Sequence, residues 1–185
     1  MFLVHGWGGW PEEGWFPDFK QKLKQKGFEV IIPEMPNSEN PQMSLWLPHL
    51  ISNVGEPNEQ TFFIGHSLGN ITILRYLEQL KPNQRVGGCV FVAGFTDDLG
   101  ITELKDSLFF KDPIDFEKSK KRCSTFIAIH SDNDKYVDVT YGDIFKKQLG
   151  AEVIILPNMH HFSGGDGIKE LPEACSAILK ISTST

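Results

Sequence analysis

Short apolar runs alternate with amphipathic stretches along almost the whole chain. The apolar runs have the length of buried strands and are rich in β-branched and aromatic residues; they cover residues 2–4, 28–32, 61–64, 88–93, 125–129 and 152–156. Apolar residues at helical spacing predict helices over residues 17–26, 44–53, 71–80, 139–149 and 171–180. This alternation predicts an α/β fold with about six strands in a mostly parallel sheet and helices on both faces.

The most informative stretch follows the run at residues 61–64, where Gly65-His66-Ser67-Leu68-Gly69 leads into a helical pattern. A serine between two glycines on a tight strand-to-helix turn is a nucleophile elbow, in which the glycines avoid collisions across the turn. In a chain with 17 glycines the five-residue pattern arises by chance roughly one time in ten. The residues around the pattern are therefore needed to tell a nucleophile elbow from a structural turn. The strand before it and the helix after it favour the elbow over a purely structural glycine-rich turn.

Other residues that could take part in catalysis or ligand binding also follow predicted strands. They lie in the glycine-rich loop at residues 6–10 and in the loops at residues 131–138 and 159–163. In a parallel sheet ligands bind at the carboxyl ends of the strands, near the point where the strand order reverses. We therefore expect these three loops to converge on Ser67.

A serine hydroxyl is a poor nucleophile at neutral pH and needs a histidine to accept its proton. His160 and His161 both follow the last predicted strand, and either could be that base. Adjacent histidines also occur as metal ligands, but no cysteine or acidic cluster at ligand spacing accompanies this pair. We therefore expect neither a metal site nor a cofactor.

The base in turn needs a carboxylate that holds the imidazole in the correct tautomer, and on this architecture the acid lies between serine and histidine in the chain. The loop after the 125–129 strand has three aspartates, Asp132, Asp134 and Asp138. Asp138 suits the N-cap of the following helix and Asp132 suits an Asx turn, which leaves Asp134 as the acid. Asp97 and Asp98 are the alternatives.

The glycine-rich loop after the first strand can bring its backbone close to a ligand. The backbone N–H groups of Trp7 and Leu68 are a candidate pair of oxyanion donors, and a structural turn packed by Trp7 is the alternative. We expect His5, directly at the strand end, to fix this loop. Trp46 is expected in the core rather than in a pocket wall.

Residues 94–122 form a longer mixed segment between two predicted strands. Phe109, Phe110 and Ile114 interrupt its polar background, as expected of a cap over an apolar pocket. We expect one domain over residues 1–185, with residues 94–122 as a candidate cap segment.

Composition narrows the class of protein. The chain has 185 residues, 40% of them hydrophobic, and a formal net charge of -6, and its only basic run is at residues 118–122; we therefore expect no nucleic-acid partner. No signal peptide or membrane span is recognisable, so we expect no membrane association. Three cysteines without metal or redox spacing suit a reducing compartment, and we expect a cytoplasmic enzyme.

Four motifs together resemble the small serine hydrolases related to retinoblastoma-binding protein 9. They are His5-Gly-Trp-Gly-Gly, Gly-His-Ser67-Leu-Gly, Ser131-Asp-Asn-Asp134-x-x-Val and His161-Phe, and the resemblance covers nearly the whole chain. It implies a compact α/β-hydrolase fold that lacks the first strands of larger members. It also implies Ser67 as nucleophile, Asp134 as acid and His161 as base. The family usually has glycine before the base, where this chain has His160.

The functional hypothesis is hydrolysis of a carboxylic ester or related acyl bond through an acyl-enzyme intermediate, with a small, apolar molecule as substrate. A carboxylesterase, a thioesterase and an amidase share this apparatus, and the sequence does not separate them. The alternative is a hydrolase-fold binding protein with little or no turnover that acts through a ligand or a protein partner.

Overall fold

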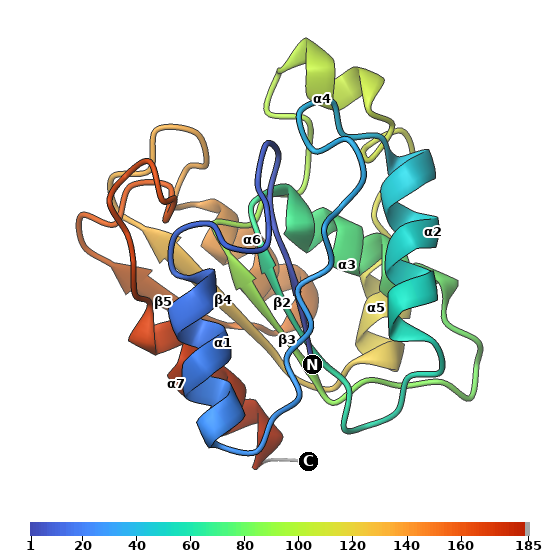
Figure 1. The fold of residues 1–185 in the computed structure, drawn as a ribbon. Helices are drawn as coiled ribbons and strands as arrows, with labels where there is room; N and C mark the ends of the chain where they lie inside the picture. Colours follow the sequence, from blue (N-terminus) through green and yellow to red (C-terminus); the bar gives the residue numbers. More distant parts are fainter. Residues whose placement is uncertain (184–185) are drawn as a thin grey trace.

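The computed structural model describes residues 1–183, and within this range five parallel strands form a single sheet. The strands are β1 (Phe2–Val4), β2 (Phe62–His66), β3 (Gly88–Val92), β4 (Phe126–Ser131) and β5 (Glu152–Leu156). They lie side by side in chain order, from β1 at one edge to β5 at the other (Figure 1). The predicted α/β class and parallel sheet are confirmed.

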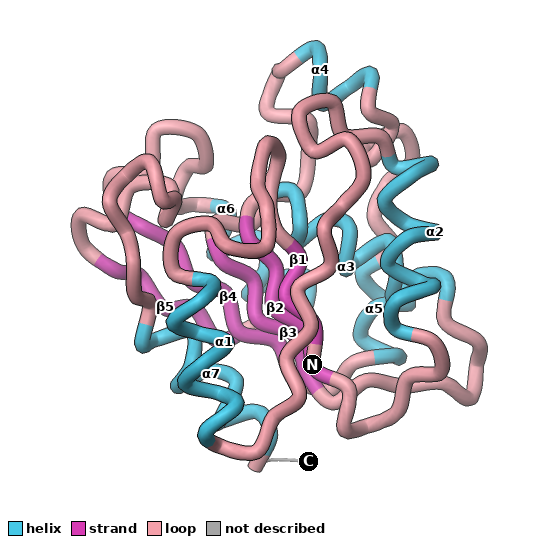
Figure 2. The backbone as a smooth tube through the Cα atoms, in the orientation of Figure 1, coloured by secondary structure: helices cyan, strands magenta, loops and turns pink. Residues whose placement is uncertain are grey.

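The sixth predicted strand, residues 28–32, pairs with the sheet at one position only. Ile31 forms an isolated parallel bridge with Phe2, through Leu3 N–H to the Ile31 carbonyl (2.9 Å) and Ile31 N–H to the Met1 carbonyl (3.0 Å). Pro33 follows within two residues and has no N–H to continue a ladder, which explains why the pairing stops. Figure 2 accordingly shows this stretch as loop running along β1.

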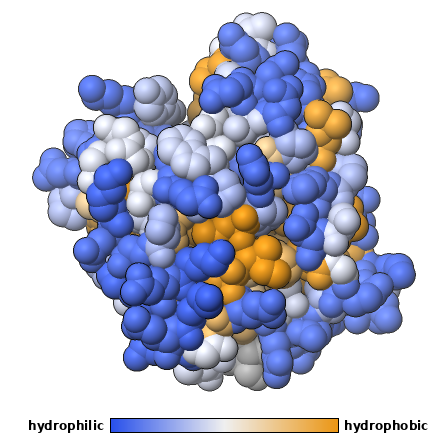
Figure 3. All heavy atoms as spheres, in the orientation of Figure 1, coloured by the Kyte–Doolittle hydropathy of each residue, from blue (hydrophilic) through white to orange (hydrophobic). Residues whose placement is uncertain are grey.

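This stretch still occupies the place of an outer strand. The chain leaves β1 to one side, makes the bridge at Ile31, and returns to the other side of β1 as β2. The direction of the chain therefore reverses at β1, and the loops after β1 and β2 lie at the point where a ligand site is expected. In Figure 3 a hydrophobic area surrounded by hydrophilic side chains lies below these loops, close to the N-terminus.

Helices cover both faces of the sheet, as predicted (Figure 1). One face carries α1 (Phe16–Gln25) and α7 (Pro172–Ser182); the other carries α2 (Met43–Val54), α3 (Leu68–Gln79), α5 (Phe116–Arg122) and α6 (Tyr141–Leu149). Successive side chains of a strand point to opposite faces, so Phe63 packs in one core and Phe62 and Ile64 in the other. The short helix α4 (Thr102–Asp106) lies beyond the carboxyl edge of the sheet.

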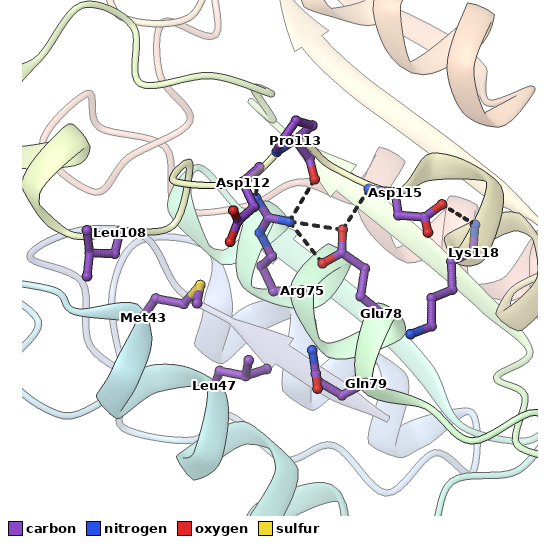
Figure 4. A pocket seen from close by; sticks show the side chains of 10 residues that line it. All are labelled: Met43, Leu47, Arg75, Glu78, Gln79, Leu108, Asp112, Pro113, Asp115 and Lys118. Atoms are coloured by element: carbon purple, nitrogen blue, oxygen red, sulfur yellow. Dashed lines mark hydrogen bonds and ion pairs between the residues drawn. The ribbon is translucent and has the colours of Figure 1, made fainter.

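The middle of the 94–122 segment is anchored to α3 by a buried arginine, Arg75. The Arg75 guanidinium donates to three backbone carbonyls of this segment, those of Phe109, Asp112 and Pro113. It also forms an ion pair with Glu78 (2.9 Å), which accepts the N–H of Asp115 (Figure 4). The side chains of Arg75 and Glu78 are 6% and 12% exposed, so little solvent screens the pair.

We expect Arg75→Met to lower the free energy of unfolding by about 3 kcal/mol, because it leaves a buried carboxylate and several carbonyls without their donor. Urea unfolding measures this change. Lys22→Met is the matched control, since Lys22 pairs with Asp18 and Glu170 at the surface and should contribute less than about 1 kcal/mol. Equal losses in the two variants would contradict the anchor.

Two buried histidines make stability depend on pH. Burial, together with the nearby positive charge of His161, lowers the pKa of His66 to about 3, and burial lowers the pKa of His130 to about 4. In an unfolded chain both rings titrate near about 6.5. Between these values the unfolded chain binds protons that the folded chain does not, so stability falls as the pH falls.

We therefore expect the free energy of unfolding to decrease from about pH 6.5 towards pH 4. These two rings contribute a slope of about 2.7 kcal/mol per pH unit, and His5, whose pKa burial also lowers, adds to it. Urea unfolding at pH 7, 6 and 5 gives this slope. His130→Gln removes one of these protons and should lower the slope by about 1.4 kcal/mol per pH unit. A flat profile over this range would show that the rings are not buried as described.

Candidate active site

Ser67 lies between the last residue of β2 and the first residue of α3, with φ 53° and ψ -121°. Few non-glycine residues adopt this backbone, so the surrounding structure must hold it. Ser67 N–H donates to the Val92 carbonyl (2.9 Å), and Asn70 Nδ2 donates to the carbonyls of both Ser67 (3.0 Å) and Val92 (2.8 Å). The strand, turn and helix predicted around Ser67 are thus present.

The glycines of the turn are required by close approach of the backbone. A Cβ at Gly69 would lie 2.0 Å from the Val4 carbonyl oxygen, and one at Gly65 would lie 2.5 Å from Asn70 Oδ1. A Cβ at Gly6 would lie 2.9 Å from Ser67 Cβ. The loop after β1 therefore packs directly against the serine.

The structure brings Ser67, His161 and Asp134 into one chain of hydrogen bonds. His161 Nε2 lies 2.9 Å from Ser67 Oγ, and His161 Nδ1 lies 2.8 Å from Asp134 Oδ2. The other carboxylate oxygen of Asp134 accepts the N–H groups of Tyr136 (2.8 Å) and Val137 (3.1 Å). The side chains of His161 and Asp134 are 15% and 2% exposed.

These contacts set the charge of Asp134. Burial alone would raise the pKa of its carboxyl, but the hydrogen bond and charge of His161 and the two backbone N–H groups outweigh burial and lower the pKa below its usual value. Asp134 is therefore ionised at neutral pH and accepts a hydrogen bond from the N–H group of His161 Nδ1. This tautomer leaves the lone pair of His161 Nε2 directed at the Ser67 hydroxyl.

The alternatives for base and acid have other partners. His160 Nδ1 lies 3.2 Å from Asn133 Nδ2, and Asp97 accepts the hydroxyl of Tyr141 (2.7 Å). Asp98 accepts the N–H of Gly100 within its own loop.

Two detailed predictions for the aspartate loop were wrong. Helix α6 begins at Tyr141 with Thr140 as its N-cap, and Asp138 accepts the N–H of Thr140 instead of capping the helix. Asp132 closes no Asx turn; its Oδ1 accepts the N–H of Asn158 (2.8 Å) from the loop after β5. The carboxylate of Asp132 is taken up by a long-range contact, whereas Asp138 does not cap the helix because α6 begins two residues later than predicted.

The loop that carries His161 is held almost entirely by side chains. The N–H groups of four consecutive residues, 158 to 161, donate in turn to Asp132, Ser131, Asn133 and Asp166 at 2.8 to 3.1 Å. Asn158, His160 and Phe162 have φ values of 57°, 49° and 58°, a conformation that is costly without glycine. Sequence reasoning missed this arrangement, although three polar residues directly before Asp134 were its signal.

The two candidate oxyanion donors, Trp7 and Leu68, both line the cavity beside Ser67. Leu68 N–H is the first of α3 and so has no acceptor within the helix, and Trp7 lies in the loop beside Ser67. His5 holds this loop as predicted: its Nε2 accepts the N–H of Met35 (3.0 Å), so its Nδ1 donates to the Gly6 carbonyl (2.9 Å).

An apolar cavity of about 310 Å³ opens beside the serine. It is lined by Trp7, Ser67, Leu68, Phe95, Leu99, Ile101, Leu104, Tyr136, Val137, His161 and Ser163. Four of its apolar side chains come from residues 95–104. The expectation that Phe109 lies over the pocket was wrong, because Phe109 is fully buried against Trp46 in the core. Trp46 is a core residue, as predicted.

Two further findings concern the described part of the chain. Among residues 1–183, no three histidine, cysteine or acidic side chains are grouped as a metal ion would require. Over the same range, none of the helices has the length and apolar content needed to cross a membrane.

Comparisons with known proteins find relatives that match most of the chain. Serine hydrolase RBBP9 of Rattus norvegicus is 30% identical over 160 residues, which cover 86% of this chain and 79% of RBBP9. YdeN of Bacillus subtilis is 28% identical over 172 residues, 93% of this chain and 90% of YdeN. The crystal structure of the ydeN gene product superimposes with a TM-score of 0.92 over 100% of this chain and 98% of that chain.

More distant structures share the fold. Est1E from Butyrivibrio proteoclasticus, at 13% identity, superimposes with a TM-score of 0.74 over 100% of this chain and 88% of Est1E. The family model described as serine hydrolase matches residues 1–180. The chain therefore belongs to the serine hydrolase family.

Proposed function

We propose that this serine hydrolase cleaves a carboxylic ester or related acyl bond, with Ser67 as nucleophile, His161 as general base and Asp134 as the acid of a triad. The observation that supports this most strongly is the continuous chain of hydrogen bonds from Ser67 Oγ through the His161 ring to Asp134. Each group lies at the distance that proton transfer needs before a substrate arrives. Asp134 also has the ionised state that the role requires.

In the proposed mechanism Ser67 Oγ attacks the carbonyl carbon of the substrate while His161 Nε2 takes the hydroxyl proton. The carbonyl oxygen becomes an oxyanion and accepts hydrogen bonds from the N–H groups of Trp7 and Leu68. His161 returns the proton to the leaving alcohol, thiol or amine, and the acyl group stays on Ser67. A water molecule then repeats the sequence and releases the acid, which restores Ser67.

The cavity beside Ser67 favours a small substrate with an apolar acyl or alkyl group. Its volume of about 310 Å³ is at the lower end of the roughly 300–1,000 Å³ that is typical of small-molecule pockets. We propose that residues 94–122 act as a cap, since Phe95, Leu99, Ile101 and Leu104 form one wall of this cavity. A cytoplasmic location is supported by the free thiols of Cys89, Cys123 and Cys175.

Labelling with a fluorophosphonate probe tests the nucleophile and the base. We expect the wild-type protein to be labelled at Ser67, as located by mass spectrometry, and Ser67→Ala to remain unlabelled. His161→Ala should label at least about 10³-fold more slowly, because the hydroxyl loses its proton acceptor.

His160→Ala is the matched control and should change the labelling rate by less than about tenfold. A larger decrease of the labelling rate in His160→Ala than in His161→Ala would show that His160 is the base. A wild-type protein that does not label at all would favour the binding-protein alternative.

The role of Asp134 is tested by Asp134→Asn. The amide oxygen can still accept the N–H groups of Tyr136 and Val137, so the loop keeps its shape. Its NH₂ group would face His161 Nδ1 and favour the wrong tautomer, and we expect kcat on p-nitrophenyl butyrate to fall by about 10³ to 10⁴. Asp97→Asn is the control; a loss of kcat in this variant comparable with that of Asp134→Asn would mean that Asp97 supplies the acid.

A further inference from the structure

A second imidazole lies directly behind the His161 ring. His66 is the last residue of β2 and is 4% exposed, and its ring centroid lies 5.2 Å from that of His161, with the ring planes at 52°. His66 Nε2 lies 2.7 Å from the backbone carbonyl oxygen of His161. The proposed mechanism makes no use of this buried titratable group.

The contact determines the tautomer of His66. A carbonyl oxygen only accepts hydrogen bonds, so Nε2 carries the proton and donates it. His66 Nδ1 is buried and has no hydrogen-bond partner among residues 1–183, as suits an unprotonated nitrogen in apolar surroundings. Trp15 and Phe16 pack edge-on against the same ring and exclude water from it. His66 is therefore a neutral, single-donor group.

Neutrality matters at this position because His161 becomes positively charged in each proposed proton transfer. A lysine or arginine behind it would repel the imidazolium, whereas a neutral N–H donor does not. Burial and the His161 charge keep the pKa of His66 near 3, so the ring stays neutral over the range in which a serine hydrolase works.

The backbone of His161 needs such a donor because its loop has three residues in the left-handed region. Asp166 accepts the N–H of His161, and His66 donates to its carbonyl, so both peptide groups around the His161 Cα are held. Trp15 Nε1 holds the next carbonyl, that of Phe162, at 3.0 Å. These contacts restrict the direction in which the His161 side chain leaves the backbone.

The His66 contact differs from the others because His66 directly precedes Ser67. Two adjacent residues of the elbow thus bind the same residue, Ser67 through the His161 ring and His66 through the His161 backbone. The distance between nucleophile and base then depends on one short, rigid connection. A misplacement of about 1 Å in such a pair costs about 10² in rate.

We propose that His66 is a positioning residue: its Nε2–H holds the His161 carbonyl and so keeps His161 Nε2 aligned with Ser67 Oγ. This inference depends on the proposed function, since it assumes that His161 is the base. His66 touches neither the substrate nor the transferred proton and acts through His161 alone.

Three substitutions of His66 test the contact by changing the length of the side chain and the presence of an N–H donor. His66→Gln keeps a neutral N–H donor of similar reach, His66→Asn carries the same amide on a chain one methylene shorter, and His66→Leu has no donor. We expect kcat on p-nitrophenyl butyrate to fall by about 10- to 100-fold in the Leu and Asn variants, with KM within about threefold of wild type. The Gln variant should recover kcat to within about fivefold.

The control is His130→Gln, which replaces another buried histidine, near the end of β4, and should leave kcat within about threefold of wild type. All rates are expressed per folded molecule, from the thermal transition of each variant. If the Leu variant does not fold, the Gln and Asn variants still test the contact. Both place the same amide group in the core, and only the Gln side chain is long enough to reach the His161 carbonyl.

The inference is overturned if Gln and Asn have equal kcat, or if the loss in each variant equals its loss of folded protein. Failure of the proposed function looks different, because the wild-type protein would then not react with the fluorophosphonate probe. A wild type that reacts, with His66→Leu reacting equally fast, would refute the role of His66 alone.

Discussion

The left-handed backbone of Ser67 is the constraint on which the rest of the molecule depends. It projects the hydroxyl beyond the sheet edge. It persists only because β1 packs against Gly69, because the loop after β1 packs at Gly6 against Ser67, and because Asn70 ties the turn to β3. A shift in any of these three elements would release the strain. The position of the nucleophile is thus a property of the central sheet as a whole.

Much of this arrangement could be predicted from the sequence, because local chemistry determines it. Glycines around Ser67, a Gly-rich loop after β1 and polar loops after β4 and β5 all belong to the carboxyl edge of a parallel sheet. The stretch at 28–32 has the composition of a strand, but Pro33 and the edge position limit its pairing to one bridge. The hydrophobic pattern of a stretch predicts which side chains are buried. It does not predict how many backbone hydrogen bonds the stretch forms with a neighbouring strand.

The contacts that hold the His161 loop could not be predicted in the same way. Asp132 has the local signature of a turn residue, and only the folded chain brings the Asn158 N–H to its carboxylate. Likewise, one wall of the cavity comes from Phe95, Leu99, Ile101 and Leu104. The more conspicuous Phe109 packs in the core instead. Long-range contacts decide which polar and apolar side chains serve the site.

The short segment along β1 also has a consequence for how copies of the chain meet. An edge strand with free N–H and C=O groups is a template on which another chain can add a strand. Here residues 28–32 lie over that edge, and Pro33 next to them offers no donor to an incoming strand. A stretch that contributes one bridge to the sheet thus protects the three-residue β1 edge, beside the nucleophile, from aggregation.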